Sequence, residues 1–137
     1  MKSKYTVGQI KKQAWTVFSL YIRMKGCLET TGTLTRGKCY TCEKTFPIKA
    51  LQAGHLLDGR NGMNFLDERG VKCQDIGCNV FKHGNKEVYI PKFIREYGQE
   101  LFDELCRLKR TPCTWKVPDY EKFILDIKEK IKYMEEL

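Results

Sequence analysis

Two cysteine pairs bracket one of the two histidines in this 137-residue chain, and this feature limits its fold more than any other. Cys39 and Cys42 form a Cys-x-x-Cys motif, which puts two thiolates on one tight turn, at the separation that a tetrahedral metal ion needs. A second pair further along the chain completes four ligands. The spacing predicts a structural zinc site made by Cys39, Cys42, Cys73 and Cys78, with Asp75 as an alternative to Cys73.

Composition narrows the class of protein. The seven cysteines are an odd number, which fits a zinc site and free thiols better than a closed disulfide framework. No apolar run approaches the length of a membrane span, and no apolar signal core follows the basic N-terminus, so we expect a cytoplasmic protein that does not enter a membrane. The net charge of +8 by itself fits a polyanionic partner, usually nucleic acid, and a surface that is basic only for solubility about equally; together with the motifs below it favours nucleic acid.

Hydrophobic residues recur at three- and four-residue steps in three parts of the chain, which is the pattern of helices with one buried face. It predicts a helix over residues 9–24 that ends at Gly26, and helical structure over residues 86–109 with Pro91 in the first turn and a break at Gly98. A last helix is expected to begin at Asp119, a good N-cap residue. Its apolar stripe suits either the core or a subunit contact.

Between these helices the sequence predicts small β-structure. Residues 27–38 suggest a loop or short hairpin, residues 51–57 a strand that carries His55, and a second strand lies around Val71. A short helix is expected from about Cys78 to Lys82. The predicted fold class is α+β, in one domain of residues 1–137: an N-terminal arm and helix (1–26), a zinc-bound core (39–85) and a helical C-terminal part (86–137).

His55 and Asn79 are the candidate catalytic residues. A neutral imidazole at cytosolic pH can take a proton from water. Asn79 directly follows the last cysteine of the core, and its amide oxygen, on a facing helix, can help to hold a divalent cation that binds a phosphate oxygen. The predicted strand, loop, strand and helix would thus place a base and a metal ion on opposite sides of one phosphate.

At these residues the chain resembles the Rap/NinG family of phage recombination endonucleases, a branch of the HNH, or ββα-metal (His-Me finger), nucleases. The resemblance covers most of the chain. It is carried by matches in the following order: Phe18-Ser-Leu-Tyr-Ile-Arg23, Cys39-x-x-Cys42 with Glu43-Lys44, Gln52-Ala-Gly-His55, Phe65-Leu-Asp-Glu-Arg69, Cys78-Asn79-Val-Phe, Gly84-Asn85, Tyr89, Tyr97-Gly98 and Leu108-Lys-Arg110.

The resemblance implies a zinc-stabilised ββα-metal core and metal-dependent hydrolysis of phosphodiesters in branched DNA, Holliday junctions and D-loops included. It implies that His55 is the general base and that Asn79 binds a catalytic Mg²⁺ or Mn²⁺, in the cytoplasm of the host if a phage encodes the chain. Two other functions stay open: a zinc-stabilised DNA-binding module without catalysis, and an HNH nuclease that acts on linear duplex DNA.

The chain departs from the family at four positions. Read without gaps, Gly70 stands where the family has an asparagine, Lys72 where it has a second histidine, and Asp75 where it has a cysteine. Cys73 lies two residues earlier, and we infer that it takes over the zinc position. Gly54 stands where related nucleases have an acidic residue, so a second ligand for the catalytic cation is not evident; Asp58, Asp67 and Asn85 are candidates.

Further residues are candidates for metal or DNA contacts. His83 lies four residues after Asn79 and would be either a metal ligand or a solvated histidine at a helix end. Arg60 lies just past the base, where a guanidinium can grip a phosphate. Lys72, Lys82 and Lys86 would follow the DNA backbone without reading its sequence. Because a junction needs two symmetric cuts, a twofold homodimer is attractive.

Overall fold

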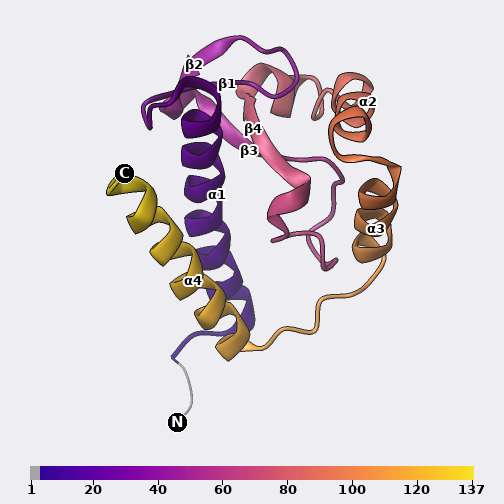
Figure 1. Ribbon diagram of the computed structural model, residues 1–137. Helices are drawn as coiled ribbons and strands as arrows, with labels where there is room; N and C mark the ends of the chain where they lie inside the picture. Colours follow the sequence, from indigo (N-terminus) through magenta and orange to yellow (C-terminus); the bar gives the residue numbers. More distant parts are fainter. Residues whose placement is uncertain (1–3) are drawn as a thin grey trace.

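The computed structural model describes residues 4–137 and has an α+β fold, as the sequence predicted (Figure 1). Two small antiparallel sheets lie between a pair of long helices on one side and a pair of shorter helices on the other. The helices are α1 (Val7–Thr31), α2 (Lys86–Tyr97), α3 (Gln99–Lys109) and α4 (Val117–Glu135). The strands are β1 (Arg36–Lys38), β2 (Thr45–Pro47), β3 (Leu51–His55) and β4 (Val71–Asp75). Short helical turns lie at Ile48–Ala50, Glu68–Gly70 and Gly77–Phe81.

Helix α1 contacts β1, β3, β4 and α4, and is longer at both ends than the sequence predicted. It begins at Val7 after a capping box in which Thr6 and Gln9 bond each other's backbone, so the expected basic arm is shorter; the part of that arm at residues 1–3 lies outside the described residues. Gly26 does not end the helix. A Cβ there would overlap the Cys73 Sγ, so Gly26 allows β4 to lie close to the helix. The helix continues to Thr31 and is capped by Gly32, which adopts a left-handed conformation (φ 74°).

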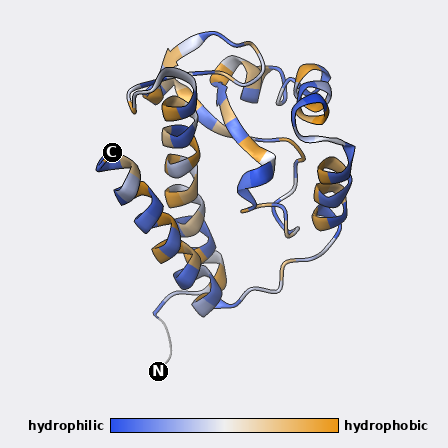
Figure 2. Ribbon diagram, viewed as in Figure 1, coloured by the Kyte–Doolittle hydropathy of each residue, from blue (hydrophilic) through white to orange (hydrophobic). Residues whose placement is uncertain are grey.

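Helix α4 packs along α1 and buries the apolar stripe seen in the sequence. Both helices alternate hydrophobic and hydrophilic residues along their turns (Figure 2). The stripe is thus part of the core of one chain. The helix begins at Val117, two residues earlier than expected, and its N-cap residue is Lys116 and not Asp119, so that prediction was wrong. Asp119 lies in the first turn, where its carboxylate accepts a hydrogen bond from the Lys116 N–H (2.8 Å). The buried residues shared by the two helices are Ile10, Ala14, Phe18, Tyr21, Ile22, Met24, Tyr120, Ile124, Ile127 and Met134.

The β3–β4 hairpin holds His55 at the end that is closed by its connecting loop. His55 pairs with Val71 and Leu51 with Asp75, so the hairpin spans the whole length from the candidate base to the candidate zinc site. Because side chains alternate across a strand, Ala53, His55 and Val71 share the face that packs on α1. Gly54, opposite Lys72, lies on the other face, toward α2.

Helices α2 and α3 meet at Gly98, whose positive φ of 95° allows the sharp change of direction predicted there. Pro91 lies inside α2 and not in its first turn, so that prediction was wrong. The two helices share a cluster of Leu56, Tyr89, Phe93 and Leu105. None of the helices in the described part of the chain is long and apolar enough to cross a membrane.

Candidate active site and metal centre

The metal cluster joins two segments of the chain. Cys39 and Cys42 lie in the turn between β1 and β2, where Glu43 adopts a left-handed conformation (φ 61°) and its N–H bonds the Cys39 carbonyl (2.9 Å). Asp75 ends β4, and Cys78 lies in the π-helical turn Gly77–Phe81. The ligand atoms of Cys39, Cys42, Asp75 and Cys78 all lie within 4.8 Å of one another. Three sulfurs and one carboxylate oxygen at this spacing can hold a metal ion such as zinc.

The electrostatics of the cluster suit a cation. Burial raises the pKa of the Cys42 thiol to about 12 and also raises the pKa of Cys78. Burial acts to raise the pKa of Asp75 as well, but hydrogen bonds from Cys39, Cys78 and Cys42 outweigh it and leave that pKa below its usual range. Without a cation the thiols therefore keep their protons beside an ionised carboxylate. A metal ion would release those protons, because thiolates are the ligands.

The inferred zinc ligand Cys73 lies outside this cluster, so its assignment is corrected. Its Sγ contacts the carbonyl oxygens of Ile22 and Arg23 in α1 (both 3.5 Å), and its side chain packs with Cys27 and Leu51. Asp75, the alternative that the sequence left open, takes its place. Of Cys73 and Asp75, it is Asp75 that reaches the three cysteines of the cluster, because it ends β4 beside the turn that carries Cys78.

The His55 ring stacks against two aromatic side chains that are distant in sequence, Trp15 and Phe65, whose own centroids are 5.0 Å apart, so the three rings form one cluster. The His55 centroid lies 5.1 Å from that of Trp15 in α1 and 5.3 Å from that of Phe65, with interplanar angles of 16° and 13°. Phe65 belongs to the loop between β3 and β4, which Asn64 braces by donating a hydrogen bond to the Leu57 carbonyl (3.0 Å). The imidazole is therefore held within an aromatic cluster, although Gly70 stands where the resemblance would place an asparagine.

The tautomer of His55 follows from its hydrogen bond to the Phe65 carbonyl. Nε2 lies 2.9 Å from the Phe65 carbonyl oxygen, and a carbonyl only accepts, so Nε2 carries the proton and Nδ1 keeps a free lone pair. Burial lowers the pKa of His55, and the positive charges of Lys86 and Arg60 act in the same direction, against the Phe65 hydrogen bond. The ring is thus neutral at pH 7, with a basic nitrogen available.

His55 and Asn79 line the same cleft, which has a volume of about 820 Å³. Asn79 Nδ2 donates to Gln52 Oε1 (2.8 Å), which leaves Asn79 Oδ1 free of that contact. The cleft is also lined by Trp15, Ala53 and Phe65, by the acidic Asp58, and by the cationic residues Lys11, Lys12 and Arg60. A basic imidazole, an amide oxygen and several cations in one cleft are the groups that hydrolysis of a phosphodiester needs.

Gly54 leaves room for two oxygen atoms where an acidic side chain would begin. A Cβ there would overlap Gln74 Oε1 and come within 3.0 Å of Asn79 Oδ1. Gln74 is fully buried, and its Nε2 donates to the Gly84 carbonyl (2.8 Å) and to Thr41 Oγ1 (3.1 Å). These bonds turn Oε1 toward Gly54, where it has no hydrogen-bond partner among residues 4–137. Hard oxygen donors of this kind suit Mg²⁺ or Mn²⁺.

A family model, the bacteriophage lambda NinG protein, matches residues 3–136. The chain belongs to the NinG family. Membership implies a phage function related to recombination. Neither a curated protein nor a solved structure matches the chain.

Two of the expected DNA contacts of this NinG chain have other partners in the structure. Lys86 Nζ donates to the carbonyl oxygens of His55 and Leu56 and pairs with Asp58 (3.4 Å), so it braces the end of the strand that carries the base. Lys72 points to the opposite face of the hairpin, where it donates to the Tyr97 hydroxyl (2.8 Å). Arg60 lies in the His55 cleft as expected, and Lys82 is exposed after the π-helical turn.

The candidates for a second cation ligand are separated by the fold. Only Asp58 lines the cleft. Asp67 pairs with Arg69 (2.7 Å), and the Asn85 amide lies 3.8 Å from Cys78 Sγ, beside the metal cluster. His83 is exposed, has a left-handed backbone (φ 49°) and is not among the residues that line the cleft.

Sequence reasoning missed Trp15, Phe65 and Gln74 as parts of the site. Trp15 and Phe65 contact His55 only after the chain folds, and each looks like an ordinary core aromatic in the sequence. Gln74 stands directly before Asp75 in β4, and its contacts with Thr41 and Gly84 likewise form only in the folded chain.

Proposed function

We propose that this chain is a metal-dependent DNA endonuclease that cuts branched recombination intermediates such as four-way junctions and D-loops. One observation supports the proposal most directly: a neutral His55, held by stacking and by the Phe65 carbonyl, lines a cleft that Asn79 and Arg60 also line. The order of a β-hairpin and a short helical turn beside a metal cluster supports a ββα-metal type of site.

The proposed reaction is hydrolysis of one phosphodiester. Nδ1 of His55 takes a proton from water, the water oxygen attacks phosphorus, and the bond to the 3′ oxygen breaks, leaving a 5′-phosphate on the product. Arg60 grips a non-bridging phosphate oxygen. Asn79 and Gln74 would supply oxygen ligands to a Mg²⁺ or Mn²⁺ ion, which when bound stabilises negative charge on the phosphate and on the leaving oxygen.

The metal cluster has a structural role in this proposal. Four protein ligands leave no open position, so a zinc ion there would not take part in the reaction. It would instead hold the β1–β2 turn, the end of β4 and the turn that carries Asn79 in one arrangement. Zinc binding and cleavage are therefore separable.

The deciding experiment incubates the purified protein with a labelled four-way junction and Mg²⁺ or Mn²⁺. We expect paired cuts near the branch point, and a loss of about 10²- to 10⁴-fold in rate for His55→Ala, the usual contribution of a general base. The His55→Ala protein should keep its zinc and its affinity for DNA. His83→Ala is the matched control, because His83 is exposed and lies outside the cleft lining, and it should cut at the wild-type rate.

Two outcomes would reject the proposal in different ways. Cleavage by His55→Ala at the wild-type rate would remove His55 as the base. Binding of the junction without cleavage at any pH or with any divalent ion would instead favour a zinc-stabilised DNA-binding module. A linear duplex of matching sequence, tested beside the junction, separates a branch-selective nuclease from an HNH nuclease that acts on duplex DNA.

A further inference from the structure

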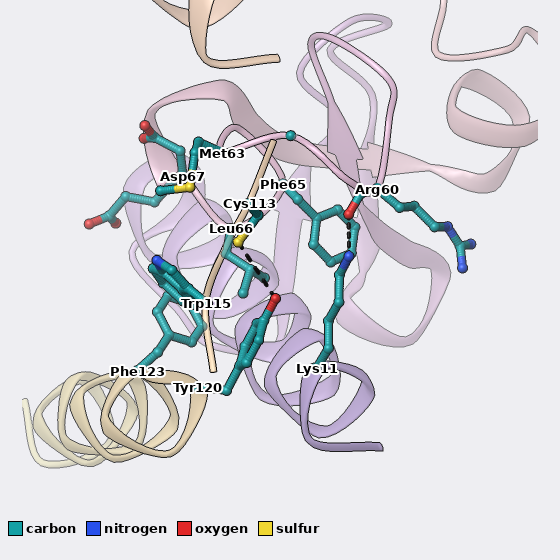
Figure 3. Close-up of a pocket in the computed structure, with 12 residues that line it drawn as sticks. Lys11, Arg60, Met63, Phe65, Leu66, Asp67, Cys113, Trp115, Tyr120 and Phe123 are labelled. Carbon is teal, nitrogen blue, oxygen red and sulfur yellow. Dashed lines mark hydrogen bonds between the residues drawn. The ribbon is translucent and has the colours of Figure 1, made fainter. Parts of the chain in front are cut away.

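A second cavity of about 330 Å³ adjoins the His55 cleft and is lined largely by aromatic and apolar side chains (Figure 3). We call it the aromatic pocket. Trp115 in the segment before α4, and Tyr120 and Phe123 in α4, form one side, and Met63, Phe65 and Leu66 of the β3–β4 loop form the other. Trp115 and Phe123 are only partly buried, so they present ring surface to the pocket.

The aromatic walls are held by contacts of their own. The Trp115 ring lies 5.1 Å from that of Tyr120 in an edge-on arrangement and 5.8 Å from that of Phe123. Tyr120 is buried, and its hydroxyl lies 3.6 Å from Cys113 Sγ. A rigid cavity with flat aromatic walls suits a planar π-system, because stacking gains contact area without ordering flexible groups.

The pocket and the cleft share three residues: Lys11, Arg60 and Phe65. Lys11 Nζ donates to the Arg60 carbonyl, a bond that ties α1 to the loop between the two cavities (Figure 3). The Phe65 ring stacks on His55 and also lines the aromatic pocket. A ligand in the pocket is therefore the immediate neighbour of a phosphate at His55.

The charges at the rim fit a nucleotide. Lys11 and Arg60 stand on the side shared with the cleft, where a phosphate would lie. The two acidic residues of the lining already have cationic partners: Asp67 pairs with Arg69 (2.7 Å), and Glu68 pairs with Lys130 (3.1 Å) and Lys25 (3.5 Å). The pocket therefore offers apolar aromatic surface beside uncompensated positive charge.

We propose that the aromatic pocket receives one unpaired nucleobase of the DNA strand whose phosphate lies in the His55 cleft. The inference rests on the proposed function only in its choice of DNA as the ligand. A base within a duplex is stacked and paired, so entry costs a few kcal/mol of unstacking, whereas an unpaired base at a branch or bulge enters at little cost. The pocket thereby accounts for a preference for branched or interrupted DNA over intact duplex.

The test measures binding without cleavage. Fluorescence anisotropy, at fixed salt and without added divalent ion, compares a short duplex that carries one unpaired nucleotide with the same duplex fully paired. Trp115→Ala should weaken binding of the interrupted duplex by about 5- to 150-fold, the range for loss of one base–aromatic stack, and change binding of the paired duplex less than about twofold. Trp115→Phe keeps an aromatic ring and should restore most of the affinity.

A second variant tests the pocket in a way that does not depend on removing a side chain that could also support the fold. Met63→Trp fills the pocket without removing an aromatic wall and should cause the same selective loss, while Tyr133→Ala removes an aromatic ring exposed elsewhere on α4 and should change neither affinity. With 2-aminopurine at the unpaired position, wild-type protein should quench its fluorescence and Met63→Trp should not. The proposal would be overturned if Trp115→Ala and Met63→Trp weakened binding of both duplexes equally, or if neither of these two variants weakened binding of the interrupted duplex. Because the test measures binding and not cleavage, its result can be interpreted even if the protein does not cut DNA.

Discussion

At the scale of single residues, the environment of His55 decides its chemistry. The rings of Trp15 and Phe65 stack against His55 in one aromatic cluster, and burial lowers its pKa. The folded state therefore binds a proton on His55 less readily than the unfolded chain, whose histidines titrate near pH 6.5. His55 thus contributes stability that is complete above about pH 6.5 and is lost as the pH falls toward the lowered pKa.

The expected result is a drop in the free energy of unfolding of the wild-type protein between about pH 7 and pH 5, with a slope of at most about 1.4 kcal/mol per pH unit from this one group. The His55→Phe variant keeps a flat ring beside Trp15 and Phe65 but cannot titrate. Its stability should fall less steeply over the same range, as measured by urea unfolding at each pH. Identical slopes for both proteins would contradict the assignment.

At the scale of elements, the metal cluster depends on where β4 ends. Asp75 is the last residue of that strand, and its Oδ2 accepts the Gly77 N–H (3.0 Å), which begins the turn that carries Cys78. Cys73 is held two residues earlier against α1. The two side chains therefore belong to different surroundings, the metal cluster and the core.

Substitution of these two residues should separate their roles. Asp75→Ala should weaken zinc binding by at least about 10- to 100-fold, because loss of a group that only orients a ligand already costs that much. Cys73→Ala should keep one zinc ion per chain, although it loses core packing. Zinc content after dialysis, measured by atomic emission, tests both variants. Retention of zinc by Asp75→Ala together with loss by Cys73→Ala would reverse the correction.

The contact between α1 and α4 should supply much of the stability. Ile127 is 4% exposed in the shared core, whereas Leu125 of the same helix is 65% exposed. Ile127→Ala should lower the free energy of unfolding by about 2–5 kcal/mol through lost burial and a cavity. Leu125→Ala, the matched control, should change it by less than about 0.5 kcal/mol. Urea denaturation measures both, and a small effect of Ile127→Ala would show that α4 is loosely held.

At the scale of the whole molecule, α1 links the parts of the proposed nuclease. Trp15 contacts the base, Lys11 lies between the cleft and the aromatic pocket, and Gly26 accommodates β4 near the metal cluster. Each chain carries one such cleft. The apolar stripe of α4 is used within the chain against α1, so a dimer would need another surface.

Symmetric resolution of a junction requires two active sites, so two chains should bind one four-way junction. We expect light scattering to give a mass of two chains and one junction at saturating protein, and a linear duplex of the same sequence to bind without that fixed ratio. Paired symmetric cuts from a complex with a single chain would contradict this prediction. Added salt should weaken the complex between the protein and the junction, because the chain carries a net charge of +8.

Local patterns in the sequence were enough for much of the fold. Three- and four-residue spacing predicted α1, α2, α3 and α4, since a helix must bury one face whatever it packs against. Gly98 marked the break between α2 and α3 because few other residues adopt its φ of 95°. The Cys39-x-x-Cys42 spacing likewise indicated a metal turn, because two ligands two residues apart already define most of its geometry.

What only the tertiary structure decided depends on contacts between distant segments. The fourth member of the candidate metal cluster, Asp75 and not Cys73, follows from the packing of β4, which holds Cys73 against α1 at Gly26. The positioning of His55 by Trp15 and Phe65, and the aromatic pocket beside it, join α1, the β3–β4 loop and α4. The sequence by itself determined which residue types are available to bind a metal ion or to accept a proton, because residue type sets what each group can bind. Their mutual placement was decided by packing of the whole chain, because no local pattern encodes the distance between segments that meet only when folded.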